Sequence, residues 1–139
     1  MIGVIFGEKG TGKTKHLLDL ANVSAKEAKG SVVFIDSDDS YMYDLSTAAR
    51  FINVRKYGIR SPKMLYGFLC GIAAMDFDLE YIYIDGFVRI TQHNMDTLKE
   101  CFEDLAAFSD KHDVKLIMSV NGSADNLPDF MKGYILRTT

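Results

Sequence analysis

The fold of this chain is decided by one stretch near its start, Gly7-Glu8-Lys9-Gly10-Thr11-Gly12-Lys13-Thr14. Its spacing, G-x-x-x-x-G-K-[ST], is typical of a loop that holds nucleotide phosphates. In such a loop, closely spaced backbone N–H groups form a cradle for anions, and the helix that follows adds the positive end of its dipole. Glycine lets the main chain approach phosphate oxygens closely. The stretch therefore predicts a phosphate-binding loop, the Walker A motif, over residues 7–14.

The residues on either side of this loop meet the two conditions that the motif requires. Residues 1–6 form an apolar run that predicts a strand, and the helix formers of 16–21 follow the loop. In this setting Lys13 is expected to reach the β- and γ-phosphates, and the Thr14 hydroxyl to ligate Mg²⁺. We expect each residue from Gly7 to Thr14 to take part in nucleotide binding.

Length and composition limit the class of protein. A chain of 139 residues with 47% apolar residues predicts one domain, 1–139, with a core that needs no disulfide or structural metal. The net charge of −3 provides no basic field, so nucleic acid is not an expected partner. No apolar run reaches the ~18 residues of a membrane span, and the chain opens on a strand without room for a signal peptide. We therefore expect a cytoplasmic protein with no membrane contact.

Predicted strands and helices alternate along the rest of the chain. This alternation indicates a three-layer α/β fold with a mainly parallel sheet and right-handed crossovers. Residues 51–54 are a further, short extended piece, and residues 41–49 a short helix. The predicted strands are residues 1–6, 31–36, 79–85, 114–120 and 133–136, and the predicted long helices run from Lys13 to just before Gly30, from Ser61-Pro62 onward, and from Asn94 to His112.

Polar residues that end three of these strands are candidates for the chemistry. Asp85 ends an apolar strand, and in phosphate-loop proteins such an aspartate holds Mg²⁺, through water, opposite the loop threonine. An acidic cluster, 36–40, follows another strand, where open α/β sheets place their ligands, although Asp39 and Ser40 also suit a helix N-cap. Asn121 can sense a γ-phosphate or its attacking water, and Asn121-Gly122 is also an ordinary turn pair.

One segment, Arg50–Lys63, carries five cations and no acidic residue. A solvated face explains such a run, and a contact with a polyanion or a neighbouring subunit is the alternative. The three histidines lie far apart and form no metal set, and Cys70 and Cys101 lack C-x-x-C spacing, which favours reduced thiols.

The order and spacing of these segments resemble the core of the RecA-like ATPases. The similarity extends from Gly12-Lys13-Thr14 through 33–38 to the strands that end at Asp85 and Asn121, and 133–136 resembles the closing strand of the KaiC and RadA branches. The resemblance implies a five-stranded sheet in the order fifth, first, fourth, third, second. It also implies phosphate binding by the loop glycines and Lys13, Mg²⁺ coordination by Thr14 and Asp85, a water-activating role for Asp38, and a γ-phosphate sensor at Asn121.

Three departures from the family pattern bear on activity. Asp38 is one methylene shorter than the family's glutamate, Gly86 replaces the glutamate that often follows the strand aspartate, and 122–129 is shorter than the mobile loop of DNA-binding members. These departures argue against DNA strand exchange and helicase activity.

These observations predict an ATP-binding protein, a Mg²⁺-dependent hydrolase that is slow or active only after assembly. An arginine for catalysis has no clear candidate near the loop, and a homo-oligomer or a protein partner is expected to supply it, with Arg55, Arg60 and Arg137 as candidates. ATP is preferred to GTP because no N-K-x-D motif follows the fourth strand. Two alternatives stay open: a nucleotide-sensing module without hydrolysis, and a small nucleotide or metabolite kinase.

Overall fold

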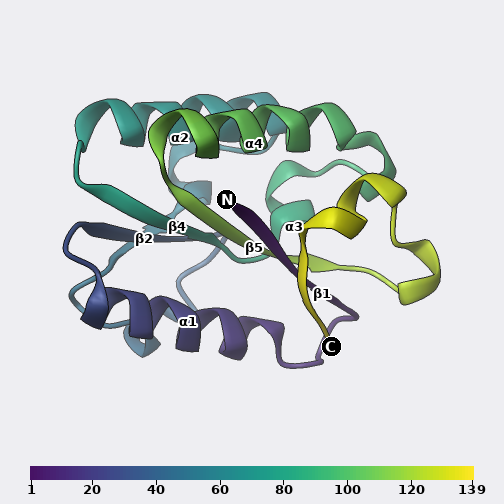
Figure 1. The fold of residues 1–139 in the computed structure, drawn as a ribbon. Helices are drawn as coiled ribbons and strands as arrows, with labels where there is room; N and C mark the ends of the chain where they lie inside the picture. The colour runs from purple at the N-terminus through teal and green to yellow at the C-terminus, as the bar shows by residue number, and fades with distance from the viewer.

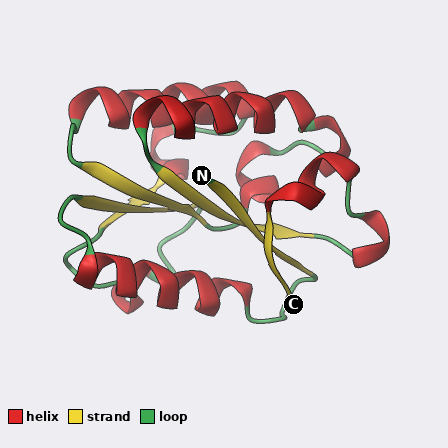
Figure 2. Cartoon of the chain, viewed as in Figure 1, coloured by secondary structure: helices red, strands yellow, loops and turns green.

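A parallel sheet of six strands forms the middle layer of the computed structural model, which describes residues 1–139 (Figure 1). Helices α2, α3 and α4 cover one face of the sheet and α1 covers the other (Figure 2). The strand order is β3-β2-β4-β5-β1-β6. The strands are β1 (Ile2–Gly7), β2 (Ser31–Asp36), β3 (Arg50–Asn53), β4 (Leu79–Ile84), β5 (Lys115–Asn121) and β6 (Ile135–Thr138), and the α-helices are α1 (Lys13–Glu27), α2 (Pro62–Met75), α3 (Phe87–Thr91) and α4 (Lys99–His112).

The strands are apolar on both faces because both faces are covered. In β1, Val4 and Phe6 belong to the core under α2, α3 and α4, whereas Ile5 between them packs on the α1 side. The side chains of successive strand residues point to opposite faces, so an uninterrupted apolar run supplies two cores at once. The three-layer α/β prediction is therefore confirmed.

The five predicted strands lie in the predicted relative order, but the sheet has a sixth strand that the prediction did not include. The five expected strands are β6, β1, β5, β4 and β2 in that order, and β3 adds a sixth at the edge beside β2. Only four residues long, β3 is held by ladder pairing and by packing of Phe51 on Phe34, whose ring centroids are 6.0 Å apart. Such a short edge strand carries a weak sequence signal.

The prediction of one long helix from Asn94 to His112 is wrong. A 3₁₀ turn (Met95–Thr97) comes first, α4 begins only at Lys99, and the Asn94 side chain makes no capping hydrogen bond. The sequence also gave no indication of α3. This helix is a single short turn between two residues with positive φ, Gly86 at 73° and Gln92 at 54°, and five residues are too few to show helical periodicity.

Two other helix predictions have different outcomes. At the start of α2, the Ser61 side chain accepts a hydrogen bond from Met64 N and Pro62 takes the first helical position, as predicted. The predicted helix at 41–49 is reduced to a 3₁₀ turn (Met42–Asp44). Further 3₁₀ turns lie at Val54–Tyr57, Ala124–Asn126 and Asp129–Tyr134.

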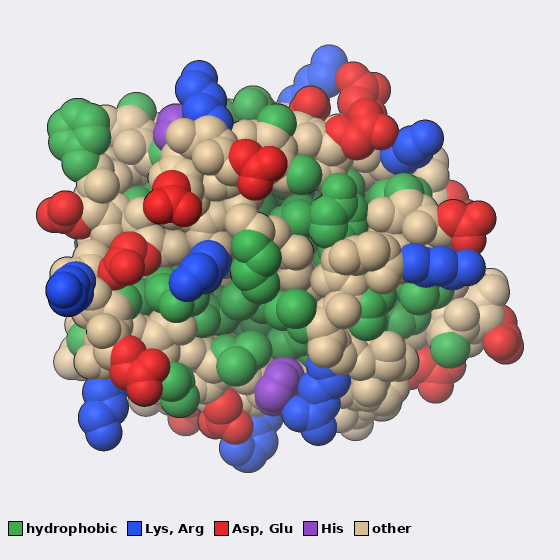
Figure 3. Space-filling model, in the orientation of Figure 1, with side chains coloured by type: hydrophobic (Ala, Val, Ile, Leu, Met, Phe, Trp, Pro, Cys, Tyr) green, Lys and Arg blue, Asp and Glu red, His purple; other side chains and the backbone are tan.

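The surface carries both signs of charge. Figure 3 shows acidic and basic side chains interspersed over one face of the molecule, without a continuous basic patch on that face. None of the helices is both long enough and apolar enough to cross a membrane.

Candidate nucleotide site

A cleft of about 470 Å³ lies at the carboxyl ends of the strands, where the sequence predicts the nucleotide. Strand β5 lies between β1, which leads into the loop, and β4, which ends at Asp85. Of the predicted site residues, those that line the cleft are Lys9, Gly10, Gly12, Lys13, Thr14, Asp38, Asp85 and Asn121. Gly7, Glu8 and Thr11 belong to the same loop but lie outside this lining.

The loop presents unpaired backbone donors. No backbone N–H from Glu8 to Gly12 donates a hydrogen bond within the chain. Gly10 and Gly12 have φ of 82° and 88°, which L side chains rarely adopt, and a Cβ at either position would meet nothing within 4 Å. The glycines are therefore required by backbone conformation rather than by crowding, and the unpaired N–H groups have the chemistry of an anion cradle.

Lys13 is buried at the base of this loop. Its side chain donates to the carbonyl oxygen of Glu8 at 2.6 Å from Nζ, and only 5% of the residue is exposed. Burial lowers the pKa of Lys13, and the charge of Asp85 opposes that shift. An anion in the cleft would provide Lys13 with a second charged partner.

Thr14 and Asp85 form a direct contact across the cleft. The Thr14 hydroxyl lies 3.2 and 3.0 Å from the two carboxylate oxygens of Asp85. The buried hydroxyl of Ser119 on β5 donates to Asp85 Oδ1 at 2.7 Å and accepts from Gly86 N at 2.8 Å, which fixes the carboxylate. A carboxylate and a hydroxyl are oxygen ligands of the kind that Mg²⁺ takes, so this donor set fits the expected metal.

Asp36, the last residue of β2, is a second buried carboxylate; the sequence analysis placed it in the acidic cluster 36–40 but gave it no role of its own. Its Oδ1 accepts from Ser37 N at 2.6 Å, while Oδ2 is buried without any hydrogen-bond partner. Burial, followed by the charge of Asp85, raises its pKa to about 6. Its position was available from the topology, because β2 and β4 are neighbours whose final apolar residues pair in register, Ile35 with Ile84.

Arg89 on α3 is a residue of the cleft that the sequence prediction missed. Its guanidinium donates to Asp36 Oδ1 at 3.1 Å and to Ser37 Oγ at 2.7 Å, and it lies 3.9 Å from Asp85 Oδ2. A Cβ on Gly86 would come within 2.5 Å of the same guanidinium. Arg89 therefore occupies the space beside Gly86 that a side chain at that position would enter. The spacing of four residues from Asp85 would have suggested the pair, had the short helix been predicted.

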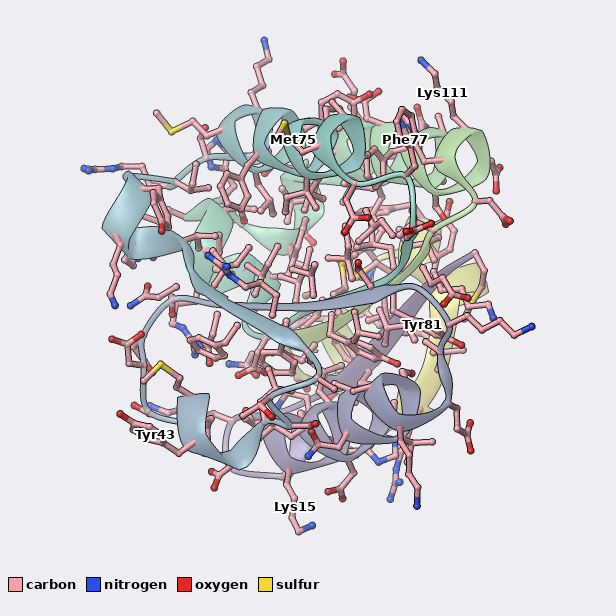
Figure 4. All side chains as sticks on the ribbon, turned by 90° about the vertical axis from the view of Figure 1, so that its left-hand side faces the viewer. Lys15, Tyr43, Met75, Phe77, Tyr81 and Lys111 are labelled. Atoms are coloured by element: carbon pink, nitrogen blue, oxygen red, sulfur yellow. The ribbon has the colours of Figure 1, made fainter.

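Asp38 and Asn121 take exposed positions on the cleft. Asp38 Oδ1 accepts from Ser40 N at 2.9 Å, and this backbone hydrogen bond is the main cause of its lowered pKa. Asn121 pairs in register with Gly7, where the loop begins, and Gly122 N donates to Gly7 O at 3.0 Å. Tyr41 also lines the cleft, whereas Tyr43 points away from the molecule (Figure 4).

The remaining arginines differ in how far they are engaged. Arg55 donates to the carbonyl oxygens of Ile59 at 3.1 Å and of Arg89 at 2.7 Å, so its guanidinium supports the end of α3. Arg60 is exposed, and Arg137 on β6 lies 3.3 Å from a ring nitrogen of His16. Within the basic segment, Lys56 also forms an ion pair with Asp39 at 3.2 Å.

A second hollow, of about 570 Å³, lies elsewhere, beside the start of α2 and of α4. Its only charged lining residues are Lys63 and Glu100, and it contains none of the predicted site residues. The convergence of the loop, three aspartates and an arginine singles out the cleft instead.

No protein-family model matches the sequence, and no curated protein sequence matches it. Among solved structures, the chain is similar to the flagellar accessory protein FlaH from Methanocaldococcus jannaschii, with a TM-score of 0.53 and 18% sequence identity. The match covers 92% of this chain and 63% of the FlaH chain. At this level of identity the likeness is one of fold alone.

Proposed function

We propose that the chain, as a single domain over residues 1–139, binds ATP with Mg²⁺ and hydrolyses it slowly or only after assembly. The observation that carries this proposal is the contact of Thr14 with Asp85, 3.0 Å apart, beside a loop whose backbone N–H groups have no partner in the chain. Those N–H groups and Lys13 suit the phosphates, and Thr14 and Asp85 suit the metal. Bound Mg²⁺ would supply charge neutralisation, on which phosphoryl transfer chiefly depends.

Other residues of the chain have roles in this proposal. Asp38 would activate water and Asn121 would sense the γ-phosphate, since both line the cleft. An arginine from a second copy or from another protein would complete the site, and exposed Arg60 is the candidate with no partner in the chain. Cytoplasmic location and preference for ATP are part of the same proposal.

A second candidate is a nucleotide-sensing module without hydrolysis. Two observations favour it: the Asp38 carboxylate holds the backbone of Ser40, and Arg89 lies over Gly86. With these two arrangements the cleft can still bind phosphates, but no carboxylate is held in position to activate a water molecule. A kinase has less support, because 122–129 has no arginine and forms only a short 3₁₀ turn at Ala124–Asn126.

The test is a thermal shift with ATP, GTP and a non-hydrolysable ATP analogue, each with Mg²⁺. A ligand at 100 times its Kd adds about 2.7 kcal/mol to the unfolding free energy. We expect ATP to raise the melting temperature of the wild type and to have no such effect on Lys13→Ala. Lys111→Ala, which removes a lysine on the surface, is the control and should keep the shift. No shift with any nucleotide would reject the proposal. Phosphate release without an added acceptor then separates hydrolysis from sensing and from a kinase.

A further inference from the structure

Two buried carboxylates and one guanidinium meet beside the predicted metal position. Arg89 lies 3.1 Å from Asp36 Oδ1 and 3.9 Å from Asp85 Oδ2. Both aspartates are nearly inaccessible, at 1% and 3% exposure. Buried charges need charged or hydrogen-bonded partners, so the guanidinium stands where the site requires a cation.

The neutralisation by Arg89 is incomplete. Asp36 Oδ2 has no partner at all, and the contact of Arg89 with Asp85 is at the outer limit of an ion pair. Lys13, the buried lysine of the cleft, is hydrogen-bonded to the Glu8 carbonyl. The pair of carboxylates therefore retains capacity for a further positive charge.

Arg89 also reaches the surface of the cleft. Its side chain is 48% exposed, and it is held by Asp36 and Ser37 Oγ and, at longer range, by Asp85. Gly86 has no side chain, and the Arg89 guanidinium lies in the space that a side chain there would fill. Arg89 lines the same cleft as Lys13 and Asn121, so a phosphate bound there would lie within the region that a long side chain covers.

We propose that Arg89 is a nucleotide-sensing arginine supplied by the same chain: its guanidinium holds a cation's position beside Asp36 and Asp85, and turns toward the terminal phosphate when a magnesium nucleoside triphosphate binds. This inference rests on the proposed function. Arg89 and Mg²⁺ would repel each other if both lay beside Asp36 and Asp85. The planar guanidinium of Arg89 can instead donate paired hydrogen bonds to phosphate oxygens. A diphosphate lacks the terminal phosphate, so Arg89 would favour ATP over ADP.

The first experiment uses Mn²⁺ alone, without nucleotide, and counts free Mn²⁺ by electron paramagnetic resonance. In Arg89→Gln the competing charge is gone, and we expect Mn²⁺ to bind about tenfold more tightly than in the wild type, within the range of coupled sites. Arg89→Lys keeps the charge and should bind Mn²⁺ as the wild type does. The control is Lys111→Gln, which removes an exposed lysine in the last turn of α4 that points outward (Figure 4). Equal Mn²⁺ affinity in wild type and Arg89→Gln overturns the proposal.

The second experiment measures Kd for ATP and for ADP, each with Mg²⁺, by calorimetry. We expect the preference for ATP over ADP to fall by about tenfold in Arg89→Gln and to stay unchanged in Lys111→Gln. Arg89→Lys should lose part of the preference, because an ammonium lacks the fork of the guanidinium. Nucleotide binding with an unchanged preference in Arg89→Gln overturns this proposal alone. A wild-type protein that binds no nucleotide overturns the proposed function and this inference with it.

Discussion

The hydroxyl of Thr14 donates toward both carboxylate oxygens of Asp85, at 3.2 and 3.0 Å, across 71 positions of sequence. The two residues come from the loop after β1 and from the end of β4, and β5 between them adds Ser119 to the same carboxylate. The predicted metal ligands are therefore already oriented by hydrogen bonds before any ligand is considered, and such orientation favours binding because less ordering remains to be done.

Replacement of Thr14 tests this contact. We expect Thr14→Ala to weaken ATP binding in the presence of Mg²⁺ by at least about tenfold, equivalent to about 1.4 kcal/mol, because one proposed metal ligand is lost. Binding of ATP in EDTA should change little. Calorimetry with and without Mg²⁺ measures both values, and Thr14→Ser, which keeps the hydroxyl, is the control. A loss of equal size in EDTA would show that Thr14 acts on the phosphates or on the fold instead.

The raised pKa of Asp36 predicts an effect of pH on stability. Its pKa is about 6 in the folded protein and 3.8 as the ordinary value, so between these pH values the folded state binds more protons than the unfolded chain. The unfolding free energy contributed by this group therefore falls as pH rises from about 4 to about 6. Asp36→Asn removes that loss of stability. In EDTA we expect the unfolding free energy of the variant to exceed that of the wild type by up to about 2 kcal/mol at pH 7.5 and by almost nothing at pH 4. Urea unfolding at the two pH values provides the comparison, and a gain of the same size at both would contradict the buried-charge explanation.

Gly86 is predicted to be sensitive to substitution for two separate reasons. Its φ of 73° strains any L side chain by about 1–2 kcal/mol, and a Cβ would also come within 2.5 Å of Arg89. Gly58 has φ of 70° with nothing near its Cβ position, so Gly58→Ala measures the strain alone. We expect Gly86→Ala to lose about 1 kcal/mol more than Gly58→Ala in urea unfolding.

The excess should vanish when Arg89→Ala is the background for Gly86→Ala, because the collision partner is then absent. If Gly86→Ala and Gly58→Ala lose equal unfolding free energy in the wild-type background, the Arg89 guanidinium moves aside without cost. Its position over Gly86 would then be weakly held.

The proposed water-activating role of Asp38 makes a kinetic prediction. Asp38→Asn should leave the Kd for ATP within about twofold and lower turnover by about a hundredfold, since general bases contribute at least this much. Asp38→Glu, which restores the missing methylene, should retain or raise turnover. Steady-state phosphate release checks both variants. Unchanged turnover in Asp38→Asn would remove the assignment and leave water activation to another group.

Much of the fold could be predicted because its signals are local. Strands β1, β2, β4 and β5 are mainly apolar runs, and their order follows from the resemblance to the RecA-like core. The edge strand β3 and the short helix α3 could not be assigned with the same certainty, because four or five residues contain too little periodicity. The error at Asn94 has a similar cause: a suitable capping residue was present, but a 3₁₀ turn separates it from the helix.

The sequence by itself determined the phosphate loop and the residues that end the principal strands, because each of these depends on neighbours in the chain. Only the tertiary structure decided how Asp36, Asp85 and Arg89 meet, since that depends on the register of β2 against β4 and on where α3 begins after Gly86. Burial then made the difference between two aspartates only two positions apart: Asp36 is enclosed with one oxygen unpaired, and Asp38 is exposed to solvent. Desolvation depends on everything packed around a carboxylate, and no local pattern of residues records it.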